Sequence, residues 1–366
     1  MQGMYSKLEE LLETITDNKI IPAISVAIGK HGDIVYAKSF GSVFETCEKV
    51  TNKFQFDIAS ITKVLTGICF MKAVEEGEIC LTDYICDIFP EFHTMKPIEK
   101  NGIIVDWCDA TKITWKHVLT HTSGMGWARP KTRPSLPHLD NGLDDIYGLP
   151  FVYQPGTQIV YSDIPIILMG KALEKKKGVA LDQLVKEELC DPLELRNTGY
   201  HRISIHQNYG RNVVPTENDT VFRKRRIWGE VHDENAFLLD GVSAHAGIFS
   251  TAEDMVILAL AYAKCLKQDG ILKKETANLM ITEQANADGD RRGLIWQLSG
   301  SGENAYTRYL SSKAYGHAGF TGCFFWNDPE NDVSIVLLSN DVYNGRDSRK
   351  LFKYRPSIME AIMENK

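Results

Sequence analysis

One serine and one lysine stand three residues apart in the segment Ser60-Ile61-Thr62-Lys63. A serine hydroxyl is a weak nucleophile near neutral pH and needs a neighbouring base before it can attack a carbonyl carbon. Residues three apart on a helix share one face, so the amine of Lys63 can reach the hydroxyl of Ser60. The pair therefore has the residue types and the spacing for acyl transfer through a serine nucleophile.

The residues after this pair predict a buried helix that begins near Ser60. Apolar side chains recur there at helical spacing: Val64, Leu65, Ile68, Cys69 and Met71. Free backbone N–H groups at a helix start favour negative charge developing beside Ser60. Burial would lower the pKa of Lys63 and supply a neutral amine as a base. The alternative is a capping serine followed by a solvated lysine, as in many helices.

Several common catalytic signatures are absent from the sequence. It contains no Gly-x-Ser-x-Gly elbow, no His-Glu-x-x-His zinc motif and neither of the glycine-rich phosphate-binding motifs. The commonest hydrolase, metalloprotease and nucleotide-binding interpretations are therefore removed.

Further segments resemble those of one enzyme family. They are Ile113–Gly124, which ends in Leu-Thr-His-Thr-Ser-Gly, then Pro155-Gly156-Thr157, Tyr161-Ser162-Asp163 and His317-Ala318-Gly319. With the Ser-x-x-Lys segment, their order and separation resemble the β-lactamase-related serine hydrolases. That family includes class C β-lactamases, penicillin-binding DD-peptidases, esterases and D-aminopeptidases. The similarity covers nearly the whole chain, and the ordered set is far more specific than any one segment.

The resemblance implies a catalytic role for each matching residue. Ser60 would form an acyl-enzyme, while Lys63 and Tyr161 would share the general-base and general-acid work. The Lys63 ammonium would favour tyrosinate character at Tyr161, and the sequence leaves open which of the two takes the first proton. Backbone N–H groups of Ser60 and Phe320 would form the oxyanion hole. Without the motif order, Tyr161 is as well explained by an ordinary buried tyrosine.

Two positions depart from the family's pattern, and both belong to the predicted substrate-binding set of Asp163, His317 and Gly319. Asp163 replaces the usual asparagine, so an amide donor becomes a carboxylate acceptor. His317 replaces the common lysine, and histidine is mostly neutral near pH 7 where lysine carries a permanent positive charge. The resemblance therefore implies weak β-lactamase activity at best, with small esters or amides as better substrates.

Three hypotheses for the function follow. The first is a serine hydrolase that works through an acyl-enzyme on small ester or amide substrates. The second is a D-aminopeptidase or DD-peptidase acting on peptides, and the third is a non-catalytic binding protein with the same fold. The chemistry requires no cofactor and no metal ion, so the predicted partner is the small-molecule ester, amide or peptide itself.

Other polar motifs have structural interpretations. His117 and His121 are four residues apart, as paired metal ligands can be, but no third ligand is near them in sequence. His245-Ala246-Gly247 resembles a family segment ahead of a helix, and we interpret it as structural. The basic run 223–226 predicts a solvated loop. The eight scattered cysteines are expected to be buried free thiols in a reducing compartment.

Hairpins predicted at opposite ends of the chain position these residues. Residues 24–28 alternate as in a strand, and residues 34–40 follow a turn as the return strand. Residues 320–326 and 333–338 predict a second hairpin around a cluster of turn residues. We expect the two hairpins to share one antiparallel sheet.

The predicted fold class is α/β (α+β), of the β-lactamase/transpeptidase type. Helices around Leu8 and Ile358 would cover a face of the sheet. Residues 1–75 and 290–366 would form the sheet domain and residues 76–289 a mostly helical inserted region, with the active site at their junction.

The inserted region combines helices with long loops. Helices are predicted at residues 164–176, 181–189 and 252–266. Residues 126–155 hold five of the chain's 13 prolines: Pro130, Pro134, Pro137, Pro150 and Pro155. This composition predicts an irregular excursion, and long loops of this kind are often functional.

Charge and hydropathy exclude some partners. A net charge of −7 without a basic face argues against nucleic acid. No apolar stretch approaches the roughly 18 residues of a membrane span. The first residues predict an amphipathic helix rather than a signal peptide, so we expect a cytoplasmic location.

Overall fold

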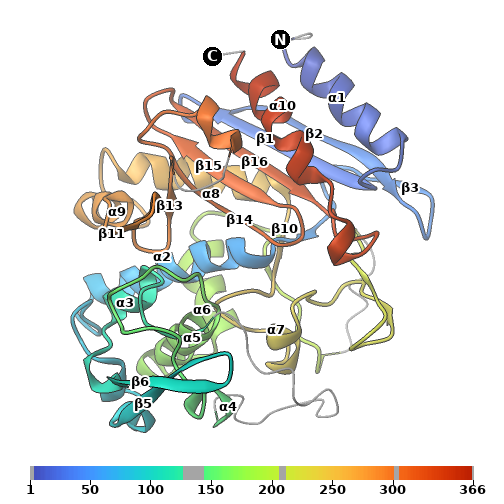
Figure 1. The fold of residues 1–366 in the computed structure, drawn as a ribbon. Helices are drawn as coiled ribbons and strands as arrows, with labels where there is room; N and C mark the ends of the chain where they lie inside the picture. The colour runs from blue at the N-terminus through green and yellow to red at the C-terminus, as the bar shows by residue number, and fades with distance from the viewer. Residues whose placement is uncertain (1–3, 127–143, 206–211, 301–304, 365–366) are drawn as a thin grey trace.

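The computed structural model describes residues 4–126, 144–205, 212–300 and 305–364. Within them the central feature is a nine-stranded sheet with the strand order β11-β12-β13-β14-β15-β16-β1-β2-β3. Its strands are β1 (Ala23–Lys30), β2 (Asp33–Val43), β3 (Glu48–Lys49), β11 (Ala285–Ala287), β12 (Asp290–Arg292), β13 (Gln297–Leu298), β14 (Tyr315–Ala318), β15 (Phe324–Asp328) and β16 (Val333–Ser339). Strands from both ends of the chain therefore lie together in one sheet (Figure 1).

The two predicted hairpins and their shared antiparallel sheet are confirmed. β1 pairs with β2, β15 pairs with β16, and β1 also pairs with β16. The strand predicted over residues 320–326 is wrong at its start, because β15 begins only at Phe324. A turn occupies the preceding residues, in which the Gly319 N–H donates to the Cys323 carbonyl at 2.8 Å. Phe320 therefore lies in a turn rather than in a strand.

Helices cover both faces of the sheet (Figure 1). These helices are α1 (Ser6–Asp17), α10 (Leu351–Met363) and α8 (Ala252–Cys265). The predicted terminal helices α1 and α10 share a core with Ile24 and Ile28 of β1, whereas Ala27 of β1 belongs to the core on the α8 side. Because successive side chains of a strand point to opposite faces, the alternation along β1 supplies both cores.

The remaining helices are α2, the helices that surround it and the helices that flank the sheet. They are α2 (Thr62–Glu75), α3 (Trp115–Leu119), α4 (Asp144–Tyr147), α5 (Ile164–Lys177), α6 (Leu181–Val185), α7 (Glu234–Leu238) and α9 (Lys274–Ile281). The predicted helices are confirmed as α5, α6 with its π-helical continuation, and α8. The division into domains stays a prediction. Two elements from within residues 76–289 belong to the sheet region, because α8 packs on the sheet and β11 extends it by one strand.

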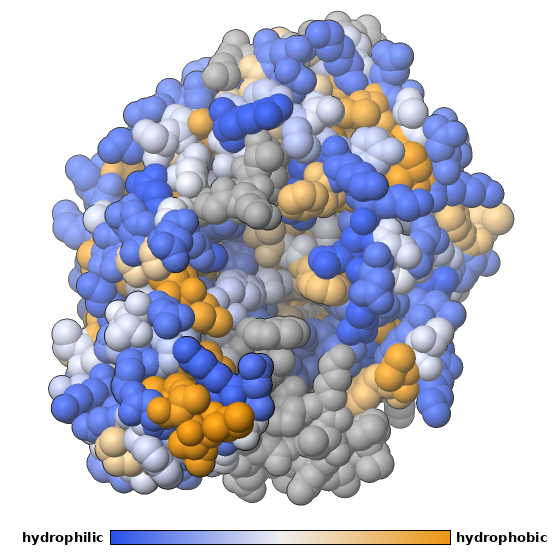
Figure 2. All heavy atoms as spheres, viewed as in Figure 1, coloured by the Kyte–Doolittle hydropathy of each residue, from blue (hydrophilic) through white to orange (hydrophobic). Residues whose placement is uncertain are grey.

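Short strands complete the fold. They are β4 (Phe56–Asp57), β7 (Gly199–Tyr200) and β10 (Ile248–Ser250) in one sheet, β5 (Met95–Lys100) with β6 (Ile103–Asp109), and β8 (Asn218–Asp219) with β9 (Arg225–Arg226). The β5–β6 hairpin carries exposed apolar side chains: Met95, Ile103, Ile104, Val105 and Trp107. Figure 2 shows them gathered low on the viewed face.

The predicted solvated loop at residues 223–226 is wrong for two of its arginines. Arg223 donates to the carbonyls of Val231 and His232 at 2.9 and 3.0 Å, and its guanidinium lies 4.3 Å from the Phe237 ring centroid. Arg226 donates to further main-chain carbonyls. Irregular backbone leaves carbonyls without partners, and these guanidinium groups satisfy them.

Other expectations from the sequence are also confirmed only in part. Six of the eight cysteines are buried free thiols as predicted, but Cys47 and Cys80 are exposed. Of the prolines in residues 126–155, Pro130, Pro134 and Pro137 lie outside the described residues. In the described part of the chain, no helix has the length and apolar character needed to cross a bilayer.

Candidate active site

Ser60 lies in a tight turn that leads from β4 into α2. Residues 59–61 form a 3₁₀ turn, and Ala59 has a φ of 47°, which is strained for a residue with a side chain. The buried Asp57 carboxylate holds this turn, because it accepts the N–H of Ala59 at 2.8 Å and that of His232 at 2.7 Å. Ser60 does not cap the helix, so the capping interpretation is wrong.

Lys63 lies one turn along α2 and is fully buried. Its Nζ donates to the Ser60 Oγ at 2.9 Å and to the His245 carbonyl at 3.0 Å. The same nitrogen is 2.7 Å from the Asp163 Oδ1. These groups, together with the Tyr161 phenol, surround the three N–H groups of the ammonium.

The expected lowering of the Lys63 pKa is wrong. Burial does act to lower it, but the charge of Asp163 and the interaction with Tyr161 outweigh burial, so the Lys63 pKa is raised. Desolvation alone would lower this pKa, but the counter-ion Asp163 reverses the direction, and the sequence does not show that Asp163 lies near Lys63. Lys63 is therefore the charged ammonium near neutral pH.

Tyr161 approaches the same pair from the segment before α5. The Lys63 Nζ lies 5.0 Å from its ring centroid, and its phenol hydrogen-bonds with Lys63 and Ser60. Burial raises the Tyr161 pKa, the Lys63 ammonium opposes the rise, and the charge of Asp163 adds to it. The net pKa is raised, so the expected tyrosinate character is wrong for the resting site, and the phenol keeps its proton.

Asp163 immediately precedes α5, but its side chain does not cap that helix. Its carboxylate instead forms the ion pair with Lys63, and its side chain is 20% exposed. An asparagine at this position would leave Lys63 without this counter-ion. The predicted contact of Asp163 with substrate stays a prediction.

His317 lies in β14, one residue before its end, beside Tyr161, with ring centroids 6.0 Å apart. Burial, with the charges of Lys63 and Arg292, lowers the His317 pKa to about 3. The predicted neutral histidine is therefore confirmed. Its Nε2 is buried without a hydrogen-bond partner among the described residues. The role of His317 in binding substrate stays a prediction.

The turn after β14 lies against the nucleophile. A side chain at Gly319 would place its Cβ 2.5 Å from the Ile58 carbonyl oxygen, so only glycine allows this close approach. Thr321 Oγ1 donates to the Asp57 carbonyl at 2.7 Å. These contacts bring Phe320 near the Ser60 turn, as the predicted oxyanion hole requires. That role of the Ser60 and Phe320 N–H groups remains a prediction.

Sequence reasoning missed Asp233 and Ser243, which contact the ring of His245 behind Lys63. The His245 carbonyl accepts a hydrogen bond from the Lys63 Nζ, and the His245 ring contacts the Asp233 carboxylate at 2.8 Å. The Ser243 hydroxyl meets the other ring nitrogen at 2.8 Å. The triplet at His245 was noted, but the sequence had no signal for its pairing with Asp233.

Two sets of residues have side chains of the types that bind metal ions. Asp163, Asp233 and His245 offer ligand atoms within 4.8 Å of one another, but the Lys63 ammonium already occupies Asp163. His117 accepts the Thr114 N–H in a capping box, as a structural histidine does. The absence of a metal requirement stays a prediction.

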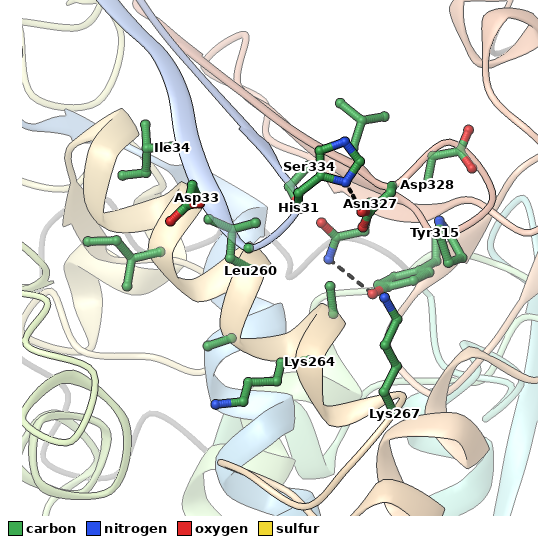
Figure 3. Close-up of a pocket in the computed structure, with 17 residues that line it drawn as sticks. His31, Asp33, Ile34, Leu260, Lys264, Lys267, Tyr315, Asn327, Asp328 and Ser334 are labelled. Carbon is green, nitrogen blue, oxygen red and sulfur yellow. Dashed lines mark hydrogen bonds and ion pairs between the residues drawn. The ribbon is translucent and has the colours of Figure 1, made fainter. Parts of the chain in front are cut away.

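A separate cavity of ≈ 730 Å³ lies between α8 and the hairpin turns of the sheet (Figure 3). Its lining includes His31, Leu260, Lys264, Tyr315 and Asn327, and none of the predicted site residues. The candidate site is thus identified by its side-chain chemistry rather than by this cavity.

Comparison with known proteins decides the family. Residues 8–358 match the family model described as Beta-lactamase. The chain belongs to the β-lactamase family. It is 28% identical over 348 residues to "N-acetylmuramyl-L-alanine amidase" of Bacillus subtilis (strain 168), covering 87% of this chain and 77% of the relative. It is 29% identical over 355 residues to "Putative D-alanyl-D-alanine carboxypeptidase" of Escherichia coli (strain K12), covering 87% and 78%.

Solved structures confirm the predicted fold. "EstCE1, a hydrolase with promiscuous acyltransferase activity" aligns with a TM-score of 0.76 at 22% identity over 99% of both chains. The octameric penicillin-binding protein homologue from Pyrococcus abyssi aligns with a TM-score of 0.71 at 22% identity, over 95% of this chain and 76% of that one. The family and its neighbours are hydrolases of the serine β-lactamase and penicillin-binding-protein type.

Proposed function

We propose that this member of the β-lactamase family is a serine hydrolase that forms an acyl-enzyme on Ser60 and acts on small esters or amides. The observation that carries the proposal is the contact of the Lys63 nitrogen with the Ser60 Oγ at 2.9 Å, backed by Asp163 at 2.7 Å. A hydroxyl, an amine and a carboxylate in a row can take a proton from the nucleophile as it attacks.

In acylation, the Ser60 Oγ bonds to the substrate carbonyl carbon and the carbonyl electron pair moves onto oxygen. Lys63 first passes a proton to Asp163, and the neutral amine that results takes the proton of the Ser60 hydroxyl, so the ammonium is restored. The N–H groups of Ser60 and Phe320 stabilise the oxyanion, each such donor typically contributing about 10²–10³ in rate.

Tyr161 acts next as the general acid. Its pKa is raised, so the phenol holds a proton that it can give to the leaving oxygen or nitrogen as the bond to the carbonyl carbon breaks. The proton stored on Asp163 returns through Lys63 to the Tyr161 oxygen. Water then attacks the acyl ester by the same steps in reverse roles and releases Ser60.

The neutral His317 favours substrates that lack a carboxylate at the position where lysine would bind one. This supports weak β-lactamase activity and small ester or amide substrates. A D-aminopeptidase or DD-peptidase activity is the second candidate, because the relatives named above carry amidase and carboxypeptidase names.

Intact-mass analysis tests the proposal. A fluorophosphonate should add one adduct to the wild-type chain and none to Ser60→Ala, whereas a penicillin should add little. Hydrolysis of p-nitrophenyl acetate against a panel of D-amino acid amides then separates the two candidates. Wild-type rates in Ser60→Ala would overturn the nucleophile and with it the proposed function.

A further inference from the structure

The residues behind Lys63 form a second hydrogen-bonded row. The Asp233 Oδ1 contacts the His245 Nε2 at 2.8 Å, and the His245 Nδ1 contacts the Ser243 Oγ at 2.8 Å. These are the residue types of a serine–histidine–aspartate triad, but the two ring nitrogens have exchanged partners, since a catalytic triad has its serine on Nε2 and its aspartate on Nδ1. Ser243 is 3% exposed and His245 is 1% exposed, so no substrate carbonyl can reach this hydroxyl. The row therefore has a role other than nucleophilic attack.

The main chain around this row holds the first turns of α2. The His245 carbonyl accepts a hydrogen bond from the Lys63 ammonium at 3.0 Å, and the Ala244 carbonyl accepts one from the Thr66 hydroxyl at 2.8 Å. The Ile248 N–H donates to the Thr62 hydroxyl at 3.2 Å. Three successive contacts thus tie residues 244–248 to the helix face that carries Lys63.

The Asp233 carboxylate is itself fixed. Its Oδ1 accepts the Ala236 N–H at 2.8 Å, which makes it the N-cap of α7, and the same oxygen contacts the His245 ring. Burial acts to raise the Asp233 pKa, but the interaction with His245, the Ala236 N–H and the nearby Lys63 outweigh it and hold this pKa below its usual range. Asp233 is therefore an ionised anchor against which the His245 ring is oriented.

We propose that Asp233 is a positioning residue which, through the His245 ring, fixes the carbonyl that holds the Lys63 ammonium against Ser60. This inference rests on the proposed function. An ammonium that loses one of its acceptors can turn away from the nucleophile. Misplacement of a catalytic group by about 1 Å can cost about 10²-fold in rate.

The test compares Asp233→Ala with Asp233→Asn, using p-nitrophenyl acetate and the rate of fluorophosphonate labelling. In Asp233→Ala, kcat and the labelling rate should both fall by about 10²-fold while KM changes little. Asp233→Asn keeps an oxygen for the His245 ring, so it should recover most of the lost rate. Asp328→Asn is the control, because Asp328 likewise accepts a main-chain N–H, that of Ser311, and is more buried than Asp233.

A pH profile gives a readout that a merely structural role would not move. Lys63 faces the charges of Asp163 and Asp233, the phenol of Tyr161, and the rings of His121 and His317. Removing the Asp233 charge weakens the field that favours the ammonium, so the alkaline limb of kcat/KM should move to lower pH in Asp233→Asn.

Failures of the two proposals are distinguishable. Rates within twofold of wild type in Asp233→Ala, or an unmoved alkaline limb in Asp233→Asn, would overturn the positioning role while Ser60→Ala stays inactive. Turnover in Ser60→Ala would instead overturn the proposed function. If Asp233→Ala does not fold, the asparagine variant and its pH profile carry the test alone.

Discussion

Ser60 and Ser243 both lie within hydrogen-bond distance of a nitrogen base, yet their surroundings differ in one decisive respect. Ser60 is partly exposed on a strained turn, and its neighbour is an ammonium backed by Asp163. Ser243 is buried beside a histidine whose other ring nitrogen contacts a carboxylate, so it has the residue types of a triad. The comparison teaches that the residue types of a triad do not make a nucleophile. Access for a carbonyl, with a donor site for its oxygen, is also needed.

The largest expected effect separates the two serines directly. Ser60→Ala should lower p-nitrophenyl acetate turnover by at least about 10³-fold, because the hydroxyl that Lys63 contacts is removed. Its thermal melting curve should be nearly unchanged. Ser243→Ala should keep most of its turnover and lose about 1–2 kcal/mol of stability, since the buried His245 ring loses a partner. Comparable turnover losses in the two variants would contradict this contrast.

Lys63→Met should remove most of the activity, by about 10²–10⁴-fold, because the base of the proton relay is gone. It should also destabilise the fold by about 1–3 kcal/mol, since Asp163 is left without its counter-ion in a mostly buried place. The double variant Lys63→Met/Asp163→Asn should recover that stability, measured by urea unfolding, but should not recover the turnover. A double variant no more stable than Lys63→Met would argue against the ion pair.

Asp163→Asn restores the asparagine common in the family and removes the counter-ion of Lys63. Because the Lys63 pKa is raised in the folded state, its contribution to stability is full below about pH 10.4, its ordinary value, and is lost as pH rises through the folded value. In Asp163→Asn this loss should begin at lower pH. Urea unfolding curves from pH 8 to pH 11 measure it, and superimposable wild-type and variant curves would contradict the raised pKa.

The smallest expected effect concerns His317. Its folded pKa of about 3 lies below the ordinary value of about 6.5, so the unfolded chain binds more protons and stability falls as pH drops below about 6.5. His317→Gln removes one such group, so its stability should fall less between pH 6.5 and pH 4. Equal slopes in the two proteins would show that His317 is protonated in the fold.

The sequence predicted the fold well where local patterns carried the information. Alternation along residues 24–28 predicted β1, a buried run at residues 333–338 after a turn cluster predicted β16, and helical spacing predicted α5 and α8. It misplaced the start of β15, because a turn closed by contacts to the Ser60 lead-in occupies residues with strand-like composition. It also misjudged Arg223, whose partners are carbonyls of a distant part of its loop.

The candidate site was likewise predicted where local motifs carried the information and mispredicted where contacts between distant segments decided the outcome. Ser60, Lys63 and Tyr161 were named from motif order, and the structure brings them together. The pKa directions of Lys63 and Tyr161 were predicted wrongly, because they depend on how near Asp163 lies to both. No spacing in the sequence measures that distance.

By itself, the sequence determined the helix that carries a serine and a lysine on one face, the strands that alternate into two cores, and the family to which the chain belongs. These depend on side-chain period and motif order, which are local along the chain. The tertiary structure alone decided that Lys63 is an ammonium, that Asp163 is its counter-ion and that Asp233 and His245 stand behind it. Those outcomes depend on charges brought within a few ångströms from distant segments, since both electrostatic attraction and the cost of burial are set by distance in space.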